Sequence, residues 1–208
     1  FNQALRSGVN QFLVAGSCFE YGKSGERYDF IPADASLEPT TSYSTSKASA
    51  SIALNGWAIE KNIQLQILRI FQVFGEGELE TRLWPSLKKA ALSGKDYPMT
   101  KGEQIRDFIH VTDIAQVNLI AMKSKISNGF FNIGTGIPTS INELAKKMIK
   151  LSNHNQKIIH GPELEGDVEI SQADMSSTKK LLDWNHEINL LEGLRDLIQK
   201  YLLLNSSK

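Results

Sequence analysis

Cysteine, charge of one sign and long apolar runs are what this sequence has least of, and each shortage excludes a class of protein. Cys18 is the single cysteine in 208 residues, so no disulfide can form within the chain. Lys plus Arg and Asp plus Glu number 23 each, and this balance leaves no basic surplus that would favour nucleic acid or a membrane surface as partner. We recognise neither a signal peptide nor an apolar run long enough to span a bilayer, and we therefore expect a cytoplasmic protein.

The remaining composition is that of a folded, soluble domain. A hydrophobic content of 41% in a chain of this length supplies one substantial core, or a core with a small attached lobe. The four histidines lack zinc-ligand spacing with cysteine, so we expect no metal site. The chain begins at Phe1 and enters a helix-like stretch at once, which leads us to expect a further segment upstream.

Two apolar runs in the first third of the chain indicate buried parallel strands. Residues 11–16 and 64–71 are almost continuously apolar, which is typical of strands that are covered on both faces. A polar loop (20–40) and a Ser- and Ala-rich helical pattern (42–62) lie between them. Strand, loop, helix and strand in this order form a crossover unit, so the sequence predicts a parallel sheet.

The rest of the chain predicts a smaller mixed lobe. Its expected elements are a helix ending at Gly94, a short strand pair within 96–111, a helix over 113–124, a strand over 129–136, a helix capped by Ser140 and Glu143, and a last helix with Leu190, Leu194, Leu197 and Tyr201 on one face. We expect residues 1–75 to end a cofactor-binding sheet and residues 76–208 to form mainly the lobe, with segments near 105–135 returning to the sheet. The predicted fold class is α/β, with helices on both faces of the sheet.

Three side chains with complementary chemistry are expected to meet at one edge of this sheet. Ser17 follows the first strand, and ligands of open parallel sheets bind beyond the carboxyl ends of the strands. Tyr43 and Lys47 are four apart at the start of the next helix, so they share one face of it. The sequence therefore brings an alcohol, a phenol and an amine to the same crevice.

This combination suits an oxidoreductase that works on a carbon bearing oxygen. Hydride transfer at such a carbon needs a proton to move on the oxygen in the same step. A phenol with an ordinary pKa of about 10 is a poor base at neutral pH, but an ammonium one helical turn away favours the phenolate. The ammonium can also hold the ribose hydroxyls of a nicotinamide cofactor, and the serine hydroxyl can donate to the substrate oxygen.

Four motifs occur in a fixed order along the chain: SCFEYG (17–22), YSTSK (43–47), LRIFQVFGEGE (68–78) and RDFIHVTDIA (106–115). Together they resemble the extended short-chain dehydrogenase/reductase family, which modifies nucleotide-linked sugars. The resemblance implies the C-terminal part of a Rossmann-type domain, a substrate lobe, and NAD or NADP as cofactor. It also implies a glycine-rich dinucleotide loop upstream, because these 208 residues contain no such fingerprint. The choice between NAD and NADP stays open.

The resemblance assigns roles to individual residues. It makes Ser17, Tyr43 and Lys47 the catalytic trio, with Tyr43 and Lys47 also holding the cofactor. The expected wall beside the nicotinamide consists of Ala15, Ile70, Phe71 and Val73, and the expected substrate contacts are Cys18, Phe19, Gln72, Arg82, Arg106 and Asp167. Arg82 and Arg106 are both expected at the nucleotide diphosphate, because one guanidinium group can form two parallel hydrogen bonds to a phosphate. The aspartate is expected at the nucleotide ribose or base.

Two departures from the family pattern narrow the chemistry. Sugar 4,6-dehydratases resembling this chain carry an Asp-Glu pair after the catalytic hydroxyl, whereas this chain has Cys18 and Phe19, so dehydration is disfavoured. An arginine that the family often places before the EGD segment is replaced by Leu164, which leaves more of the diphosphate binding to Arg82 and Arg106. A surface ion pair with the adjacent Asp107 is the alternative role for Arg106.

Three functions fit these residues. The first is reduction of a 4-keto sugar nucleotide by NAD(P)H with Tyr43 as proton donor, which the wording of SCFEYG and FGEGE favours. The alternative is a nucleotide-sugar 4-epimerase, which uses the same trio to oxidise the sugar and to reduce it again on the other face. The third is a non-catalytic cofactor-binding protein, although binding alone does not require a phenol beside an ammonium.

We expect a homodimer formed through the helix that carries Tyr43 and Lys47. The resemblance implies that this helix packs against its mate in a four-helix interface. Its small residues, Ala48, Ser49, Ala50 and Ser51, permit close helix approach.

Overall fold

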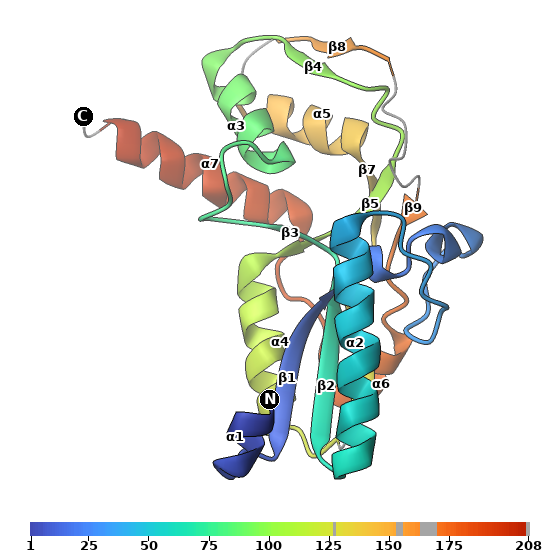
Figure 1. The fold of residues 1–208 in the computed structure, drawn as a ribbon. Helices are drawn as coiled ribbons and strands as arrows, with labels where there is room; N and C mark the ends of the chain where they lie inside the picture. Colours follow the sequence, from blue (N-terminus) through green and yellow to red (C-terminus); the bar gives the residue numbers. More distant parts are fainter. Residues whose placement is uncertain (127, 153–155, 163–169, 207–208) are drawn as a thin grey trace.

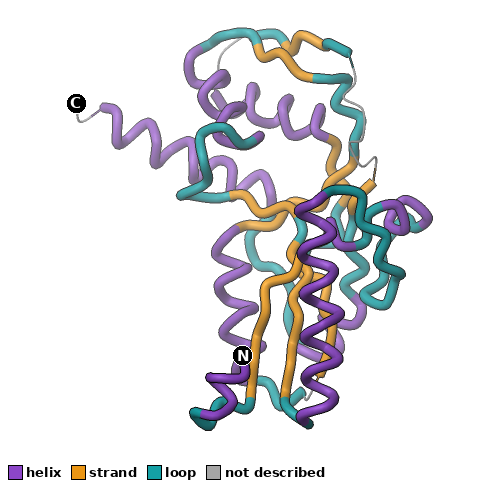
Figure 2. The backbone as a smooth tube through the Cα atoms, in the orientation of Figure 1, coloured by secondary structure: helices purple, strands orange, loops and turns teal. Residues whose placement is uncertain are grey.

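A parallel sheet and a smaller lobe of helices and short strands make up the structure, which is a computed structural model (Figure 1). It describes residues 1–126, 128–152, 156–162 and 170–206. Figure 2 shows the long strands of the sheet at one end and the helices of the lobe at the other. The two parts meet where the long strands end.

The sheet contains three parallel strands in the order β1-β2-β6. These are β1 (Gln11–Ser17), β2 (Gln64–Ile70) and β6 (Asn128–Ile133). Gly16 of β1 lies beside Arg69 of β2, and Ile70 lies beside Ile133 of β6. This confirms the two predicted strands and the crossover between them.

Helices cover both faces of this sheet, as the apolar runs predict. Helix α2 (Ser42–Lys61) packs through Ala58 on Leu65 and Ile67, which point to one face of β2. Helix α4 (Val111–Lys123) packs through Val117 and Ala121 into the core on the other face, where Leu68 lies. Because successive side chains of a strand alternate between faces, one continuous apolar strand supplies both cores.

Helix α2 begins and ends where its local sequence directs. Thr41 precedes it, and its side chain accepts a hydrogen bond from the Ser44 N–H while the Ser44 side chain accepts one from the Thr41 N–H. This reciprocal cap satisfies free N–H groups at the helix start. Asn62 ends the helix in the left-handed conformation at φ 53°. The cap fixes the first turn of α2 next to the end of β1.

Shorter strands join the sheet to the lobe. They are β3 (Gln72–Phe74), β5 (Ile105–His110), β7 (Pro138–Ser140) and β9 (Ile170–Ser171), with β5 pairing to the other three. Within the segment 105–135, β6 belongs to the first sheet, whereas β5 belongs to this second one.

The strand pair predicted within 96–111 needs correction. Both strands form, as β4 (Tyr97–Met99) and β5, but they do not pair with each other. Instead β4 pairs with β8 (Ile158–His160), and β5 pairs with β3, β7 and β9. Sequence proximity favours a hairpin, but each strand has a partner that is distant along the chain.

Three helices of the lobe enclose a third core. They are α3 (Leu83–Ser93), α5 (Ile141–Ser152) and α7 (Leu190–Ser206), and they bury Leu87, Met148 and Leu194 between them. Gly94 ends α3 in the left-handed conformation, as predicted. Of the cap predicted from Ser140 and Glu143 one half is present, because the Ser140 hydroxyl accepts from the Glu143 N–H while the Glu143 carboxylate pairs with Lys147. The short helices α1 (Asn2–Arg6) and α6 (Ser176–Leu182) lie beside the sheet.

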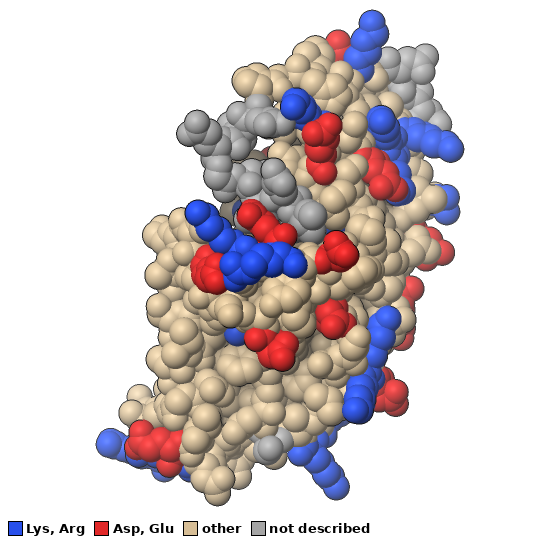
Figure 3. All heavy atoms as spheres, turned by 90° about the vertical axis from the view of Figure 1, so that its right-hand side faces the viewer, with Lys and Arg blue, Asp and Glu red and all other residues tan. Residues whose placement is uncertain are grey.

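The surface carries charges of both signs. Figure 3 shows lysine and arginine side chains interspersed with aspartate and glutamate on one face of the molecule. Within the described residues, no helix has the length and apolar character needed to cross a membrane.

Candidate active site

A cavity of about 640 Å³ opens at the carboxyl ends of β1 and β2. The end of β1 forms one side, the first turn of α2 forms another, and residues 70–79 form the opposite wall. This is the edge of a parallel sheet at which loops and helix N-termini converge and where ligands bind.

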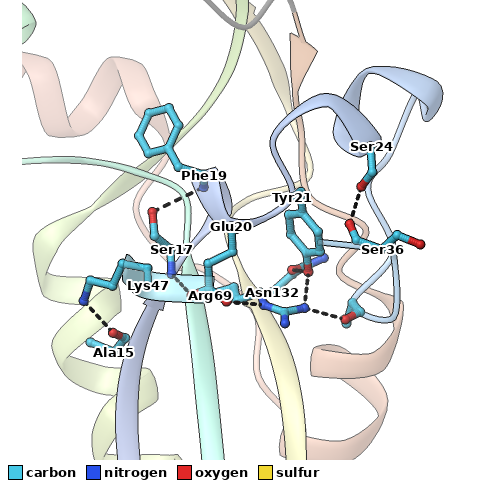
Figure 4. Close-up of polar contacts among 11 residues, drawn as sticks. Ala15, Ser17, Phe19, Glu20, Tyr21, Ser24, Ser36, Lys47, Arg69 and Asn132 are labelled. Carbon is cyan, nitrogen blue, oxygen red and sulfur yellow. Dashed lines mark hydrogen bonds and ion pairs between the residues drawn. The ribbon is translucent and has the colours of Figure 1, made fainter. Parts of the chain in front are cut away.

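Ser17 is the last residue of β1 and the cap of a short 3-10 turn (Cys18–Glu20). Its hydroxyl oxygen accepts a hydrogen bond from the Phe19 N–H at 3.3 Å, and its own N–H donates to the Glu20 carboxylate at 2.8 Å. Both contacts hold Ser17 at the base of the cavity (Figure 4). Among the described residues the Ser17 hydroxyl has an N–H donor but no acceptor for its own proton, which can therefore donate to a ligand.

Tyr43 and Lys47 project from the first turns of α2 into the same cavity. The Lys47 ammonium donates to the Ala15 carbonyl at 2.9 Å, which ties α2 to β1. The Tyr43 side chain is 54% exposed, and its ring meets the Phe19 ring edge to face at 6.4 Å. The three expected catalytic residues therefore line one space, as the helical spacing predicts.

Most of the expected binding residues line this cavity as well. On the side expected to face a nicotinamide these are Ala15, Ile70, Phe71 and Val73, and on the substrate side they are Phe19, Gln72 and Arg82. Arg82 caps α3 and keeps 63% of its side chain exposed. The exposed guanidinium can therefore reach a ligand.

Cys18 and Arg106 are not among the residues that line this cavity, and their predicted contacts with the substrate stay predictions. Cys18 starts the 3-10 turn with its side chain in the core, where burial raises the pKa of the thiol to about 11. Arg106 is 6% exposed within β5, between β7 and β9, and donates to the Ile105 carbonyl. Asp107 is buried as well, so the alternative role of Arg106, an ion pair with Asp107 on the surface, is wrong. Asp167, like Leu164, lies outside the described residues.

The acidic wall formed by residues 75–79 was not predicted. Glu78 lines the cavity with its carboxylate 3.6 Å from the Arg82 guanidinium, and burial raises the pKa of that carboxyl against the opposing effect of Arg82. Among the described residues, its Oε2 is buried without a hydrogen-bond partner. The position of GEGELE directly after a strand was the available signal, because the same edge-of-sheet rule that locates Ser17 applies to it.

A buried ion pair behind Ser17 was also missed. Glu20 and Arg69 are 0% and 3% exposed, and the Arg69 Nε lies 3.0 Å from the Glu20 Oε2. The signal was Ser17 followed three residues later by Glu20, which is the spacing of a capping box.

The described residues contain no group of three or more His, Cys, Asp or Glu side chains placed to hold a metal ion. His110 ends β5, and its Nδ1 accepts a hydrogen bond from the Thr112 N–H. Burial lowers the pKa of this imidazole. These contacts give His110 a structural role as the N-cap of α4.

A serine, a tyrosine and a lysine at the carboxyl edge of a parallel α/β sheet define the site class of the short-chain dehydrogenases and reductases. The chain belongs to the NAD dependent epimerase/dehydratase family, whose model matches residues 1–134. This family is the extended branch that the four sequence motifs resemble.

Similar proteins include several nucleotide-sugar enzymes. A UDP-glucose 4-epimerase of Rhizobium meliloti (strain 1021) is 28% identical over 209 residues, which cover 90% of this chain and 62% of that protein. The crystal structure of a UDP-glucose 4-epimerase from Thermotoga maritima with UDP-glucose superposes with a TM-score of 0.89 at 26% identity, covering 98% of this chain and 67% of that one. The structure of MoeE5 with UDP-glucose and NAD gives a TM-score of 0.85 at 26% identity, covering 100% and 69%. This chain thus spans about 62% of the length of the curated epimerase.

Proposed function

We propose that the protein to which this chain belongs is an NAD-dependent nucleotide-sugar 4-epimerase. The observation that carries the proposal is the convergence of Ser17, Tyr43 and Lys47 on one cavity. The names of the similar proteins support the choice of reaction, because several of them are UDP-sugar 4-epimerases. The residues of the motifs SCFEYG and FGEGE favour a 4-keto reductase, but two short motifs are weaker support for a reaction than the names of these relatives.

The trio has a direct role at the sugar oxygen. Tyr43, as phenolate, takes the proton from the 4-hydroxyl when the sugar is oxidised and returns it when the sugar is reduced. The Ser17 hydroxyl donates a hydrogen bond to the same oxygen and so fixes its position. Lys47 adds a positive charge to the same cavity, one helical turn from Tyr43. NAD, when bound, supplies the hydride acceptor and later the hydride donor.

The walls of the cavity fit the nicotinamide half of NAD. Ala15, Ile70 and Phe71 form an apolar surface beside Lys47, and a flat ring can rest on such a surface. The Lys47 ammonium donates one of its three N–H groups to the Ala15 carbonyl, and the other two are available for ribose hydroxyls.

Arg82 is the residue that we assign to the diphosphate of the nucleotide sugar. Its guanidinium is mostly exposed at the cavity, and Glu78 holds it from one side. Arg106, which the resemblance also assigns to the diphosphate, is 6% exposed within β5 and is not among the residues that line this cavity. The guanidinium of Arg82 can bind one phosphate group through two parallel N–H···O hydrogen bonds.

The test uses the protein at its natural length with UDP-glucose and UDP-galactose. We expect interconversion of the two sugars without net loss of NADH. Tyr43→Phe should lower kcat by a factor of about 10² to 10⁴, because it removes the group that transfers the proton. Tyr28→Phe is the matched control: Tyr28 is 37% exposed and lies outside the cavity, so its loss should leave kcat unchanged.

The same assay separates the competing functions. Stoichiometric consumption of NAD(P)H with a 4-keto sugar nucleotide, without isomerisation, would establish the reductase instead. A cofactor-binding protein without catalysis would give no turnover with any of these substrates. Full activity of Tyr43→Phe would contradict the assigned mechanism in either enzyme.

We also propose that the protein forms a homodimer through α2. Ile52 and Ile59 are 62% and 64% exposed and lie on the same side of this helix, two turns apart. Of the four small residues expected there, Ala48 and Ser51 are buried within the chain itself. Sedimentation of the natural-length protein should show a dimer, which Ile52→Asp shifts towards the monomer. A monomeric unsubstituted protein would refute this proposal.

A further inference from the structure

The carboxylate of Glu20 joins the backbone of Ser17 to the side chain of Arg69 in the interior of the protein. Its Oε1 accepts the Ser17 N–H at 2.8 Å, and its Oε2 accepts the Arg69 Nε–H at 3.0 Å. Figure 4 shows these contacts on the side of the Ser17 nitrogen, while the Ser17 hydroxyl points towards Phe19. We propose that Glu20, held by Arg69, is a positioning residue that sets the direction of the Ser17 hydroxyl, an inference that rests on the proposed function.

Arg69 is itself fixed by several contacts. Its Nη1 donates to the Ala33 carbonyl at 2.8 Å and to the Tyr21 hydroxyl at 3.2 Å. Its guanidinium carbon lies 4.8 Å from the centre of the Tyr21 ring and 4.6 Å from that of the Phe130 ring. A guanidinium with this many contacts does not change rotamer freely, so the Glu20 carboxylate that it holds has one position.

Gly16 leaves the space that this carboxylate occupies. In the pairing of β1 with β2, Gly16 lies beside Arg69. A Cβ at position 16 would lie 2.6 Å from the Glu20 Oε1, closer than such atoms approach one another. Any side chain there would push the carboxylate away from the Ser17 N–H.

Stability alone is a weak reason for a buried ion pair. Two apolar side chains of similar volume often stabilise a core as well as a buried pair does, because both charges lose their hydration. What an apolar pair cannot provide is an acceptor for the Ser17 N–H. That hydrogen bond, with the one from the Phe19 N–H to the Ser17 Oγ, fixes both the backbone and the side chain of Ser17.

The consequence for the reaction is geometric. If the Ser17 hydroxyl is held in one direction, it meets the 4-oxygen of the sugar without reorganising when the charge on that oxygen changes. A misplacement of about 1 Å at a reacting group costs on the order of 100-fold in rate. Glu20 therefore acts on kcat through Ser17, although it touches no substrate.

The experiment is a double-mutant cycle in the natural-length enzyme, assayed as UDP-glucose to UDP-galactose conversion. Glu20→Gln should lower kcat by about 10- to 100-fold with KM changed by less than about threefold. In the Ser17→Ala background the same substitution should lower kcat by less than about twofold, because the hydroxyl that it positions is gone. Equal losses in both backgrounds would overturn the proposal.

Tyr21→Phe is the matched control. It removes two buried hydrogen bonds from the neighbourhood of Arg69, one to Arg69 and one to Asn132, but leaves the Glu20 contact to Ser17 intact. We expect a lower melting temperature with kcat within about twofold of the unsubstituted enzyme. A loss of kcat as large as that of Glu20→Gln would show that general damage to this core explains both effects.

Two further measurements keep the test decisive. If Glu20→Gln alone does not fold because Arg69 is left as a buried lone charge, the variant Glu20→Leu/Arg69→Met removes both charges and the acceptor of the Ser17 N–H, and it carries the same cycle. Hydrogen exchange at the Ser17 amide needs no substrate, and it should be faster in Glu20→Gln than in Tyr21→Phe. An unsubstituted enzyme without epimerase activity would count against the proposed function, whereas unchanged exchange at Ser17 would count against Glu20.

Discussion

Replacing Asp107 by Asn should be among the most destabilising single-atom changes in this chain. Asp107 is fully buried, and its carboxylate accepts four hydrogen bonds. Oδ1 accepts the Thr135 N–H and hydroxyl, both at 2.7 Å, while Oδ2 accepts the Gly136 N–H at 2.8 Å and the Ala173 N–H at 3.1 Å. One carboxylate thus joins β5 to the turn after β6 and to the segment that precedes α6.

The magnitude follows from these contacts. An asparagine can keep one acceptor oxygen for Thr135, but its NH₂ group then faces the N–H groups of Gly136 and Ala173, which lose their acceptor. Each buried donor left without a partner costs about 1–3 kcal/mol, so we expect a loss of about 4 kcal/mol in the free energy of unfolding. For a chain of this size, 1 kcal/mol corresponds to about 2–4 °C, which gives a fall in Tm of about 8–16 °C.

The assay is thermal and urea unfolding of the natural-length protein, with two graded controls. Asp113 is 2% exposed and accepts one N–H on each oxygen, from Glu187 and Ile188, so Asp113→Asn leaves one donor unpaired and should cost about half as much. Asp29 is exposed, and Asp29→Asn should change stability by less than about 0.5 kcal/mol. If Asp107→Asn were no more harmful than Asp29→Asn, the reasoning from buried donors would be wrong.

Two other predictions concern ligand binding and pH. Arg82→Ala should raise KM for the nucleotide sugar by about 10- to 100-fold with little change in kcat, because hydrogen bonds to charged groups contribute about 1.5–3 kcal/mol and this one is remote from the reacting carbon. Initial rates test this, and an effect on kcat alone would contradict the assignment of Arg82 to the diphosphate. The other prediction concerns the dependence of stability on pH: burial raises the pKa of Cys18 from 9.0 to about 11, so the unfolded chain loses the thiol proton first as pH rises. Stability that is fully present below pH 9 should therefore decline between pH 9 and 11. Urea midpoints across this range should show a shallower decline for Cys18→Ala, and an unchanged slope would refute the role of the thiol.

The sequence determined those features that depend on local pattern. Continuous apolar runs predicted β1 and β2, and the helical spacing of Tyr43 and Lys47 placed both side chains on one face of α2. Ser17 was located by its position after a strand, and the four motifs identified the family that the comparison confirms. These inferences succeed because side-chain direction follows directly from the period of a helix or strand. The roles of the site residues remain proposals.

Only the tertiary structure decided the features that depend on distant partners. Cys18 and Phe19 are neighbours, yet the 3-10 turn buries one in the core and turns the other towards Tyr43. Arg106 is buried because β7 and β9 flank β5. Its partners in the two pairings, Thr139 and Ser171, lie 33 and 65 residues further along the chain (139 − 106 and 171 − 106), so the local sequence around Arg106 carries no sign of them.

The Glu20–Arg69 pair shows the same division within one contact. The capping box that joins Ser17 to Glu20 spans three residues and could be read from the sequence. The ion pair to Arg69 spans 49 residues, and it exists only because β1 and β2 are adjacent and Gly16 leaves room between them. Local spacing fixes which groups lie near a turn, whereas strand pairing fixes which distant charge they meet in the interior.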